Sequence, residues 1–132
     1  MKKEAEQWLK YAEENRQSAE ILLKSGLINS CLQNCQQAIE KYLKALLVER
    51  SLPFVKTHSI RALVSVLREN NMSMSASDDE MDLIDSIYLP SKYPLFSVLP
   101  DFTPDAELGE TCLRLLQKLR SDVMRYLDAK KG

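Results

Sequence analysis

An amphipathic segment near the middle of the chain constrains the fold more than any other feature. Between residues 28 and 47, apolar side chains recur at steps of mostly three and four residues: Ile28, Cys31, Leu32, Cys35, Ala38, Ile39, Tyr42, Leu43, Leu46 and Leu47. This spacing follows the period of an α-helix, about 3.6 residues per turn. It predicts a helix that begins between residues 27 and 30, ends between residues 48 and 50 and buries one face. Pro53 closes it, because the residue before a proline is pushed out of the helical region.

A second helix is predicted immediately before this one, over residues 3–24. Its apolar positions have the same helical spacing, and Gly26 after it suits the left-handed conformation found past helix C-termini. Two long helices joined by so short a turn should pack as an antiparallel hairpin.

Three further helices are predicted in the second half of the chain. The predicted starts are, in chain order, Thr57 or Ser59, the capping box of Ser77 and Glu80, and Thr103 followed by Pro104 and Asp105. The helix that follows Ser77 should run to Pro90, and the last one nearly to the C-terminus. No strand is expected beyond a short apolar run over residues 95–99. The fold class is therefore all-α, an up-and-down antiparallel bundle of about five helices.

Size and charge fit one domain inside the cell. With 132 residues and 45% hydrophobic content, residues 1–132 can form a single domain with a substantial core. Lys and Arg number 18 against 19 Asp and Glu, for a net charge of -1, so any anion site must be local. No segment resembles a signal peptide, and no apolar run approaches the roughly 18 residues of a membrane span. We predict a cytoplasmic protein with no membrane partner.

The cysteines favour a structural role. Cys31, Cys35 and Cys112 are an odd number at no familiar spacing, which indicates reduced thiols. Cys31 and Cys35 lie one turn apart on the apolar stripe, as expected of small core residues. A zinc site that added His58 and Cys112 would have the right number of ligands, but it lacks a closely spaced pair motif. We predict no metal and no other cofactor.

Polar residues in three parts of the sequence could form a binding site. The candidates are Gln37, Lys41, Lys44, Lys56, His58, Arg61, Lys92 and Tyr93. The first three share one side of the central helix. The next three surround the start of the following helix, where the helix dipole favours an anion such as phosphate. The last two belong to a proline-rich segment. If this segment folds over the central helix, the result is a basic pocket with an aromatic wall, suited to a nucleotide phosphate and base.

The same residues also allow a structural interpretation. Lys41 and Lys44 would then be solvated surface charges, Glu40 would pair with Lys44 four residues on, and Tyr93 would fill space in the bundle. Trp8, within the apolar stripe of the first helix, is expected to be a core anchor, with base stacking as the alternative.

Five short motifs follow one another along the chain. They are Trp8-Leu9-x-x-Ala12 with Ala19-x-x-Leu22-Leu23, then Gln36-Gln37-Ala38-x-Glu40-Lys41-x-x-Lys44-Ala45-Leu46, then His58-x-Ile60-x-x-Leu63, then Tyr88-x-x-Ser91-Lys92-Tyr93-Pro94. In this order they resemble the HEPN domain (higher eukaryotes and prokaryotes nucleotide-binding). The resemblance implies a helical bundle that is usually a homodimer. It also implies that the gene for such a domain often lies beside the gene for a small nucleotidyltransferase, and that in many cases the two proteins form a prokaryotic toxin–antitoxin or related two-component pair.

Some members of the family are metal-independent ribonucleases that use an Arg and a His, and here the sequence departs from their pattern. His58 is the only histidine, and the seven residues between Arg50 and His58 exceed the spacing of the ribonuclease motif. We therefore do not carry the enzyme assignment over. The resemblance favours a nucleotide- or nucleic-acid-phosphate-binding module. The alternatives are a ribonuclease that uses His58 with Arg50 or Arg61, and a dimerisation scaffold with no ligand.

Overall fold

The computed structural model describes residues 1–53, 56–92 and 104–129, except for the side chains of residues 88–92 and 129. Within these ranges the chain forms α1 (Lys3–Lys24), α2 (Ile28–Glu49), α3 (Ile60–Glu69), α4 (Asp78–Lys92) and α5 (Ala106–Ala129). The all-α prediction is confirmed. The expected strand-like run over residues 95–99 and the proposed helix start at Thr103 lie outside the described residues.

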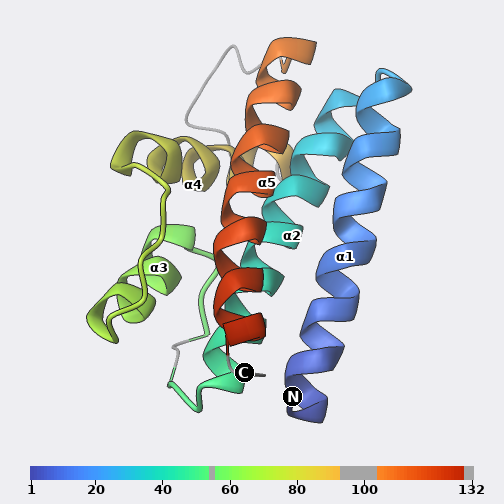
Figure 1. The fold of residues 1–132 in the computed structure, drawn as a ribbon. Coiled ribbons are helices and arrows are strands. Elements are labelled where there is room, and N and C mark those ends of the chain that lie inside the picture. The colour runs from blue at the N-terminus through green and yellow to red at the C-terminus, as the bar shows by residue number, and fades with distance from the viewer. Residues whose placement is uncertain (54–55, 93–103, 130–132) are drawn as a thin grey trace.

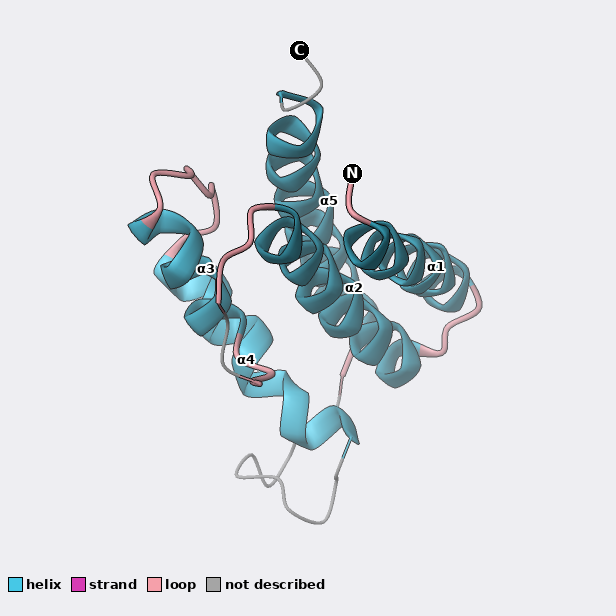
Figure 2. Cartoon of the chain, turned by 90° about the horizontal axis from the view of Figure 1, so that it is seen from below, coloured by secondary structure: helices cyan, strands magenta, loops and turns pink. Residues whose placement is uncertain are grey.

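Helix α2 lies at the centre of the molecule and contacts all four other helices. In the views of Figures 1 and 2, α1 packs on one side of α2 and α5, whereas α3 and α4 lie on the other side. Helix α1 runs antiparallel to α2, as the short turn between them predicts (Figure 1). None of the helices in the described part of the chain is both long and apolar enough to cross a bilayer.

Three helices end in the same way, with a left-handed residue just past the C-terminus. These residues are Gly26 (φ 75°), Ser51 (φ 54°) and Asn71 (φ 64°). In each case the next amide bonds back into the last turn, as in Leu27 N to Leu22 O at 2.9 Å. The prediction for Gly26 is confirmed. Helix α2 ends at Glu49, within the predicted limits.

Helix starts follow their predicted caps in two cases. Ser59 Oγ accepts from Ala62 N at 3.1 Å, which selects Ser59 over Thr57 as the cap of α3. Ser77 and Glu80 form the capping box, with Glu80 N to Ser77 Oγ at 3.1 Å and Ser77 N to Glu80 Oε1 at 2.9 Å.

The start of α5 lies within the predicted region, and the end of α4 differs from the prediction. At the start of α5, Asp105 Oδ1 accepts from Leu108 N at 2.8 Å, so Asp105 is the cap. Helix α4 continues past Pro90 to Lys92. Because Pro90 lies in the last turn, its missing N–H removes only one bond of the helix.

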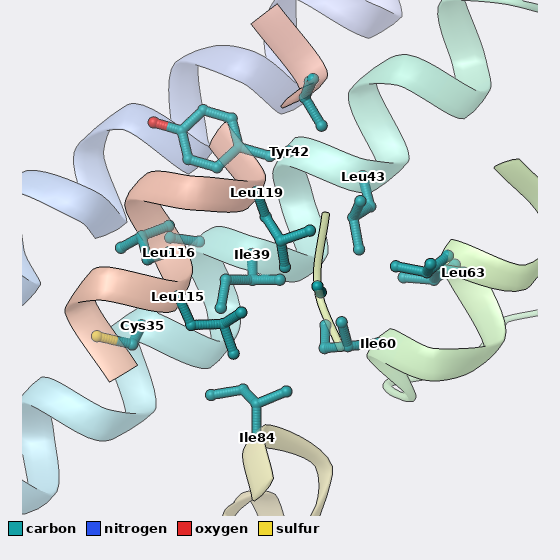
Figure 3. Close-up of a cluster of buried hydrophobic side chains, with 14 of the residues drawn as sticks. Cys35, Ile39, Tyr42, Leu43, Ile60, Leu63, Ile84, Leu115, Leu116 and Leu119 are labelled. Carbon is teal, nitrogen blue, oxygen red and sulfur yellow. The ribbon is translucent and has the colours of Figure 1, made fainter. Parts of the chain in front are cut away.

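The core is built around α2 and is mainly aliphatic (Figure 3). Tyr42 is its largest fully buried side chain, and all three cysteines are buried and free, which confirms their role in the core. Ala5, Ala12 and Ala19 are the buried positions of α1, one every seven residues. These small side chains let α1 approach α2 closely.

Candidate functional site

The polar face of α2, where the sequence predicts either solvated charges or a site, is largely buried. Gln36, Glu40 and Lys44 are 1%, 4% and 6% exposed. They lie four residues apart, so their side chains stack along one side of the helix. The prediction that Lys44 is a solvated surface charge is wrong, because Trp8 of α1 and His58, just before α3, lie against this side of α2.

Glu40 is the central acceptor of this face. Its Oε2 accepts from Lys44 Nζ at 3.0 Å, which confirms the predicted pair, and its Oε1 lies 2.9 Å from His58 Nδ1 and 3.3 Å from Gln36 Nε2. Gln36 Nε2 also donates to the His58 carbonyl at 3.2 Å. We call these four residues the Glu40 cluster. Lys44 compensates the buried negative charge, as a buried carboxylate requires.

The imidazole of His58 lies at the rim of the cluster, with 57% of its side chain exposed. A carboxylate can only accept, so the contact with Glu40 places a proton on Nδ1. The cluster therefore fixes the orientation of a solvent-facing imidazole. Among the predicted residues, Gln37 joins the cluster as well, since its Nε2 donates to Gln36 Oε1 at 2.8 Å.

Two aromatic side chains of α1 lie beside the lysines of α2. Lys44 Nζ is 5.4 Å from the centre of the Trp8 ring, and Lys41 Nζ is 5.9 Å from that of Tyr11. Lys41 Nζ also donates to Asn15 Oδ1 at 2.7 Å. Trp8 is only half-buried, so the expectation of a core anchor is wrong. The aromatic rings next to the lysines come from α1, which the sequence-based prediction of the site did not include.

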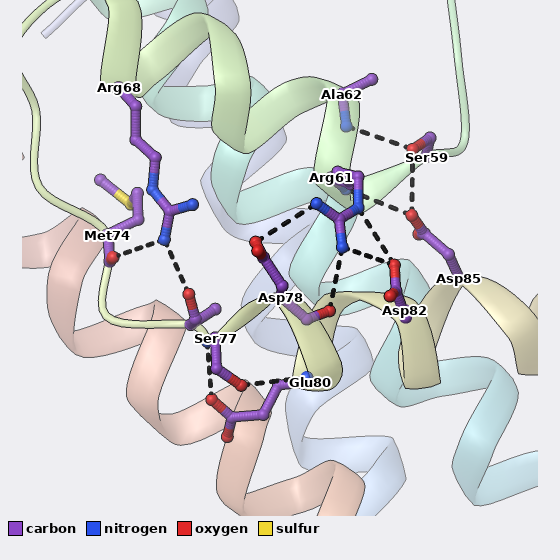
Figure 4. Close-up of polar contacts among 11 residues, drawn as sticks. Ser59, Arg61, Ala62, Arg68, Met74, Ser77, Asp78, Glu80, Asp82 and Asp85 are labelled. Atoms are coloured by element: carbon purple, nitrogen blue, oxygen red, sulfur yellow. Dashed lines mark hydrogen bonds and ion pairs between the residues drawn. The ribbon is translucent and has the colours of Figure 1, made fainter.

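The start of α3 is already occupied by a carboxylate of the protein (Figure 4). Asp85 of α4 accepts from Ile60 N at 2.7 Å, from Arg61 N at 3.3 Å and from Ser59 Oγ at 3.0 Å. The sequence predicts an anion at this helix terminus, and the structure supplies it from α4.

Arg61 points to α4 and not to α2. Its guanidinium donates to Asp82 at 2.6 and 3.0 Å and to Asp78 at 3.2 Å. The hydrogen bonds to Asp82 raise the pKa of Arg61 above its ordinary value. We call Arg61, Asp78 and Asp82 the Arg61 cluster.

The remaining predicted residues either lie apart from the Glu40 cluster or are not among the residues whose side chains the structure describes. Arg50 donates to the Tyr126 carbonyl at 3.1 Å, and its guanidinium lies over the Tyr126 ring. Lys56 is exposed in the segment before His58. The side chain of Lys92 and the whole of Tyr93 are not among the described residues, so their predicted approach to α2 stays a prediction.

The thiols do not form a metal site with His58. Among the described residues no group of three His, Cys, Asp or Glu side chains could hold a metal ion. Burial raises the pKa of Cys112 to about 12. The hydrogen bond that the Cys35 thiol makes to Cys31, followed by burial, raises the pKa of Cys35 well above its ordinary value. For Cys35 and Cys112 these are the properties of inert core thiols, whereas the same hydrogen bond lowers the pKa of Cys31.

Comparisons with known proteins identify the family. The HEPN domain family matches residues 5–129, so the chain belongs to the HEPN domain family. Its structure is similar to that of TT1696 from Thermus thermophilus, with a TM-score of 0.75 and 27% identity over 92% of this chain and 96% of that one. An archaeal HEPN homologue, ST0689, shares the fold with a TM-score of 0.70 and 23% identity over 96% of this chain and 98% of that one. A comparison with curated proteins gives no match.

Proposed function

We propose that this HEPN domain binds a phosphate-bearing ligand, a nucleotide or nucleic acid, at the edge of the Glu40 cluster. The observation that carries the proposal is the exposed imidazole of His58, held by the buried carboxylate of Glu40, which also pairs with Lys44 of α2. An exposed imidazole suits a phosphate oxygen, and Lys41, on the same helix as Glu40, is the proposed second contact. Arg61 contributes less to this proposal than the sequence suggests, because two carboxylates already neutralise it.

The proposal includes the biological setting that the family resemblance implies. The domain would act as a homodimer together with a small nucleotidyltransferase, in a toxin–antitoxin or related system. Co-purification of an adjacent nucleotidyltransferase with the tagged protein, and light scattering of the protein alone, test these two parts separately.

The binding test compares three variants by calorimetry with AMP and with a single-stranded RNA. His58→Gln and Lys41→Gln should each weaken binding about tenfold, as expected for the loss of one charged contact. Lys24→Gln removes an exposed lysine near the other end of α1 and should change nothing. Lys44 is unsuitable for this test because it is buried against Glu40. Equal affinities for all variants would exclude a phosphate site at this rim.

The contact of His58 with Glu40 also favours a second candidate function, RNA cleavage. A carboxylate that fixes the imidazole proton on Nδ1 directs the other ring nitrogen to acid–base chemistry. The two arginines that the sequence offers as helpers bond elsewhere, Arg50 to Tyr126 and Arg61 to α4. Cleavage of RNA in the presence of a chelator that His58→Ala abolishes would establish this function. Intact RNA with both proteins would reject it.

A further inference from the structure

Helix α1 carries a stripe of exposed residues that the proposed phosphate site does not use. The helix forms one edge of the molecule, with its inner side against α2 and α5 (Figures 1 and 2). The residues of the stripe alternate in steps of four and three, the spacing of the contact positions in a coiled coil: Lys3, Gln7, Lys10, Glu14, Gln17, Ile21 and Lys24. This spacing places them along one line of the helix.

Exposed apolar side chains concentrate on the same helix. The large hydrophobic residues that are exposed in the described part of the chain all belong to α1 or lie close to its ends: Met1, Tyr11, Ile21 and Leu27. Ile21 is 64% exposed and belongs to the stripe, and Tyr11 is 46% exposed and lies beside it. One exposed hydrophobic residue needs no explanation, but a group along one helix is typical of a surface that contacts another protein.

The polar residues of the stripe are complementary to a second copy of α1 that runs in the opposite direction. When two antiparallel copies cross level with Ala12, the residues that face each other are Lys10 and the partner's Glu14, Gln7 and the partner's Gln17, and Lys3 and the partner's Ile21. Two-fold symmetry forms each of these contacts twice. In a parallel pair, each charge of the stripe would face its own copy, and like charges repel.

Lys10 and Glu14 are available for these contacts. Both are exposed, and among the described residues neither has an ion pair or a side-chain hydrogen bond. A Lys four residues before a Glu is the less favourable order for a pair within one helix. The two charges can therefore pair with a second copy without breaking a contact of the monomer. A partner with charges of one sign would meet a like charge on this stripe, whereas a second copy matches both signs.

We propose that the outer face of α1 binds a second copy of this chain in antiparallel orientation. Two symmetric ion pairs join Lys10 to the partner's Glu14, and Tyr11 of each copy flanks the crossing point. The inference rests on the proposed function, because it assigns an interface to the homodimer proposed there. The stripe is mainly polar, so the dimer should be weak, with a dissociation constant on the order of 10 μM.

Charge reversal tests this interface by analytical ultracentrifugation of the whole protein over a range of concentrations. Lys10→Glu and Glu14→Lys each replace two attractions by two repulsions, so each should weaken the dimer at least about tenfold. The double variant restores both pairs with exchanged signs and should dimerise like the wild type. An equimolar mixture of the two single variants should form heterodimers, because one then supplies only acidic and the other only basic groups. Both positions are exposed, so the variants should fold.

Lys24→Glu is the matched control. It makes the same change of net charge on the same stripe, but Lys24 lies beyond the overlap of the two helices, so the dissociation constant should not change. A wild-type dimer that Lys10→Glu leaves unchanged places the interface on another face and leaves the proposed homodimer intact. Weakening in both single variants without recovery in the double variant rejects the antiparallel pairing. If the wild type is monomeric at every concentration, the proposed homodimer and this interface fail together.

Discussion

His58 and Arg61 are three residues apart, and the sequence predicts both as phosphate ligands. In the structure their side chains contact different helices. His58 contacts Glu40 of α2, and the side chains of Glu40 and Lys44 are only 5% and 8% exposed. Arg61 contacts Asp78 and Asp82 of α4, and these three side chains are 41%, 73% and 64% exposed. The two clusters therefore contain similar ion pairs in opposite environments.

Burial determines how much each cluster contributes to stability. Breaking a buried pair leaves one charge without water and without a partner, which is costly, whereas an exposed pair is replaced by solvent at little cost. The Glu40 cluster should consequently act as a rigid support for His58. In the Arg61 cluster, the two carboxylates should mainly neutralise the charge of Arg61 and so reduce the capacity of Arg61 to bind a ligand.

The largest effect is expected for Glu40→Leu. This change leaves the Lys44 ammonium buried and unpaired from its carboxylate, so the free energy of unfolding should fall by about 3–5 kcal/mol. Urea denaturation measures it. The double variant Glu40→Leu, Lys44→Met removes both charges and should regain most of the loss. A decrease below about 1 kcal/mol in the single variant would contradict the distinction between the clusters.

Asp85→Ala should have the next largest effect. Asp85 accepts from two amides and a hydroxyl at the start of α3, and loss of such a cap costs about 1–2 kcal/mol. Asp79→Ala is the control, because Asp79 is an exposed residue of α4, the helix that carries Asp85. If both variants unfold at the same urea concentration, the carboxylate does not cap α3.

The next prediction concerns Glu13, whose ion pairs with Arg16 and Arg120 are less exposed than the Arg61 cluster and more exposed than the pair of Glu40 and Lys44. Burial alone would raise the pKa of Glu13, but the hydrogen bonds from Arg16 and Arg120 outweigh it and hold this pKa below its ordinary value of 4.5. The lowered pKa means that the carboxylate stabilises the fold above pH 4.5 and that this contribution disappears as pH falls through the folded-state pKa.

The corresponding variant is Glu13→Gln. It should be less stable than the wild type at pH 7 by up to about 1 kcal/mol. The difference should shrink in acid, because the wild-type carboxyl is then protonated. Urea midpoints at several pH values check this, and a difference independent of pH would show that the loss is not electrostatic.

The smallest effect is expected for Arg61→Ala. Because the Arg61 cluster is exposed and solvent replaces its contacts, the urea midpoint should not shift measurably at physiological salt. A shift as large as that of Asp85→Ala would assign the Arg61 cluster a structural role and remove the contrast with the Glu40 cluster.

Features encoded by neighbouring residues were predictable. The ends of α1 and α2, the cap at Ser59 and the capping box at Ser77 depend on groups within about four positions of each other, so the sequence reveals them directly. The same holds for the pair of Glu40 and Lys44. The continuation of α4 past Pro90 was missed, because proline is a strong stop signal in the sequence and a weak one in the last turn.

The candidate site was predictable only in part. The four-residue spacing of Gln36, Glu40 and Lys44 marks a polar line on α2, but it does not tell whether that line is buried. The contacts of Asp85 with α3 and of Trp8 with Lys44 join residues far apart in the sequence. No local signal encodes such contacts, and only packing selects them.

The sequence by itself determined the helices, the apolar stripe of α2 and the HEPN motifs along it, because periodicity and capping act within one or two turns. The tertiary structure decided what the polar face of α2 contacts. By placing α1 and the start of α3 over that face, it buried Glu40 and Lys44, oriented His58 and assigned Arg61 to α4. The physical reason is that the environment of a charge depends on which helix covers it, and helix packing depends on the whole core.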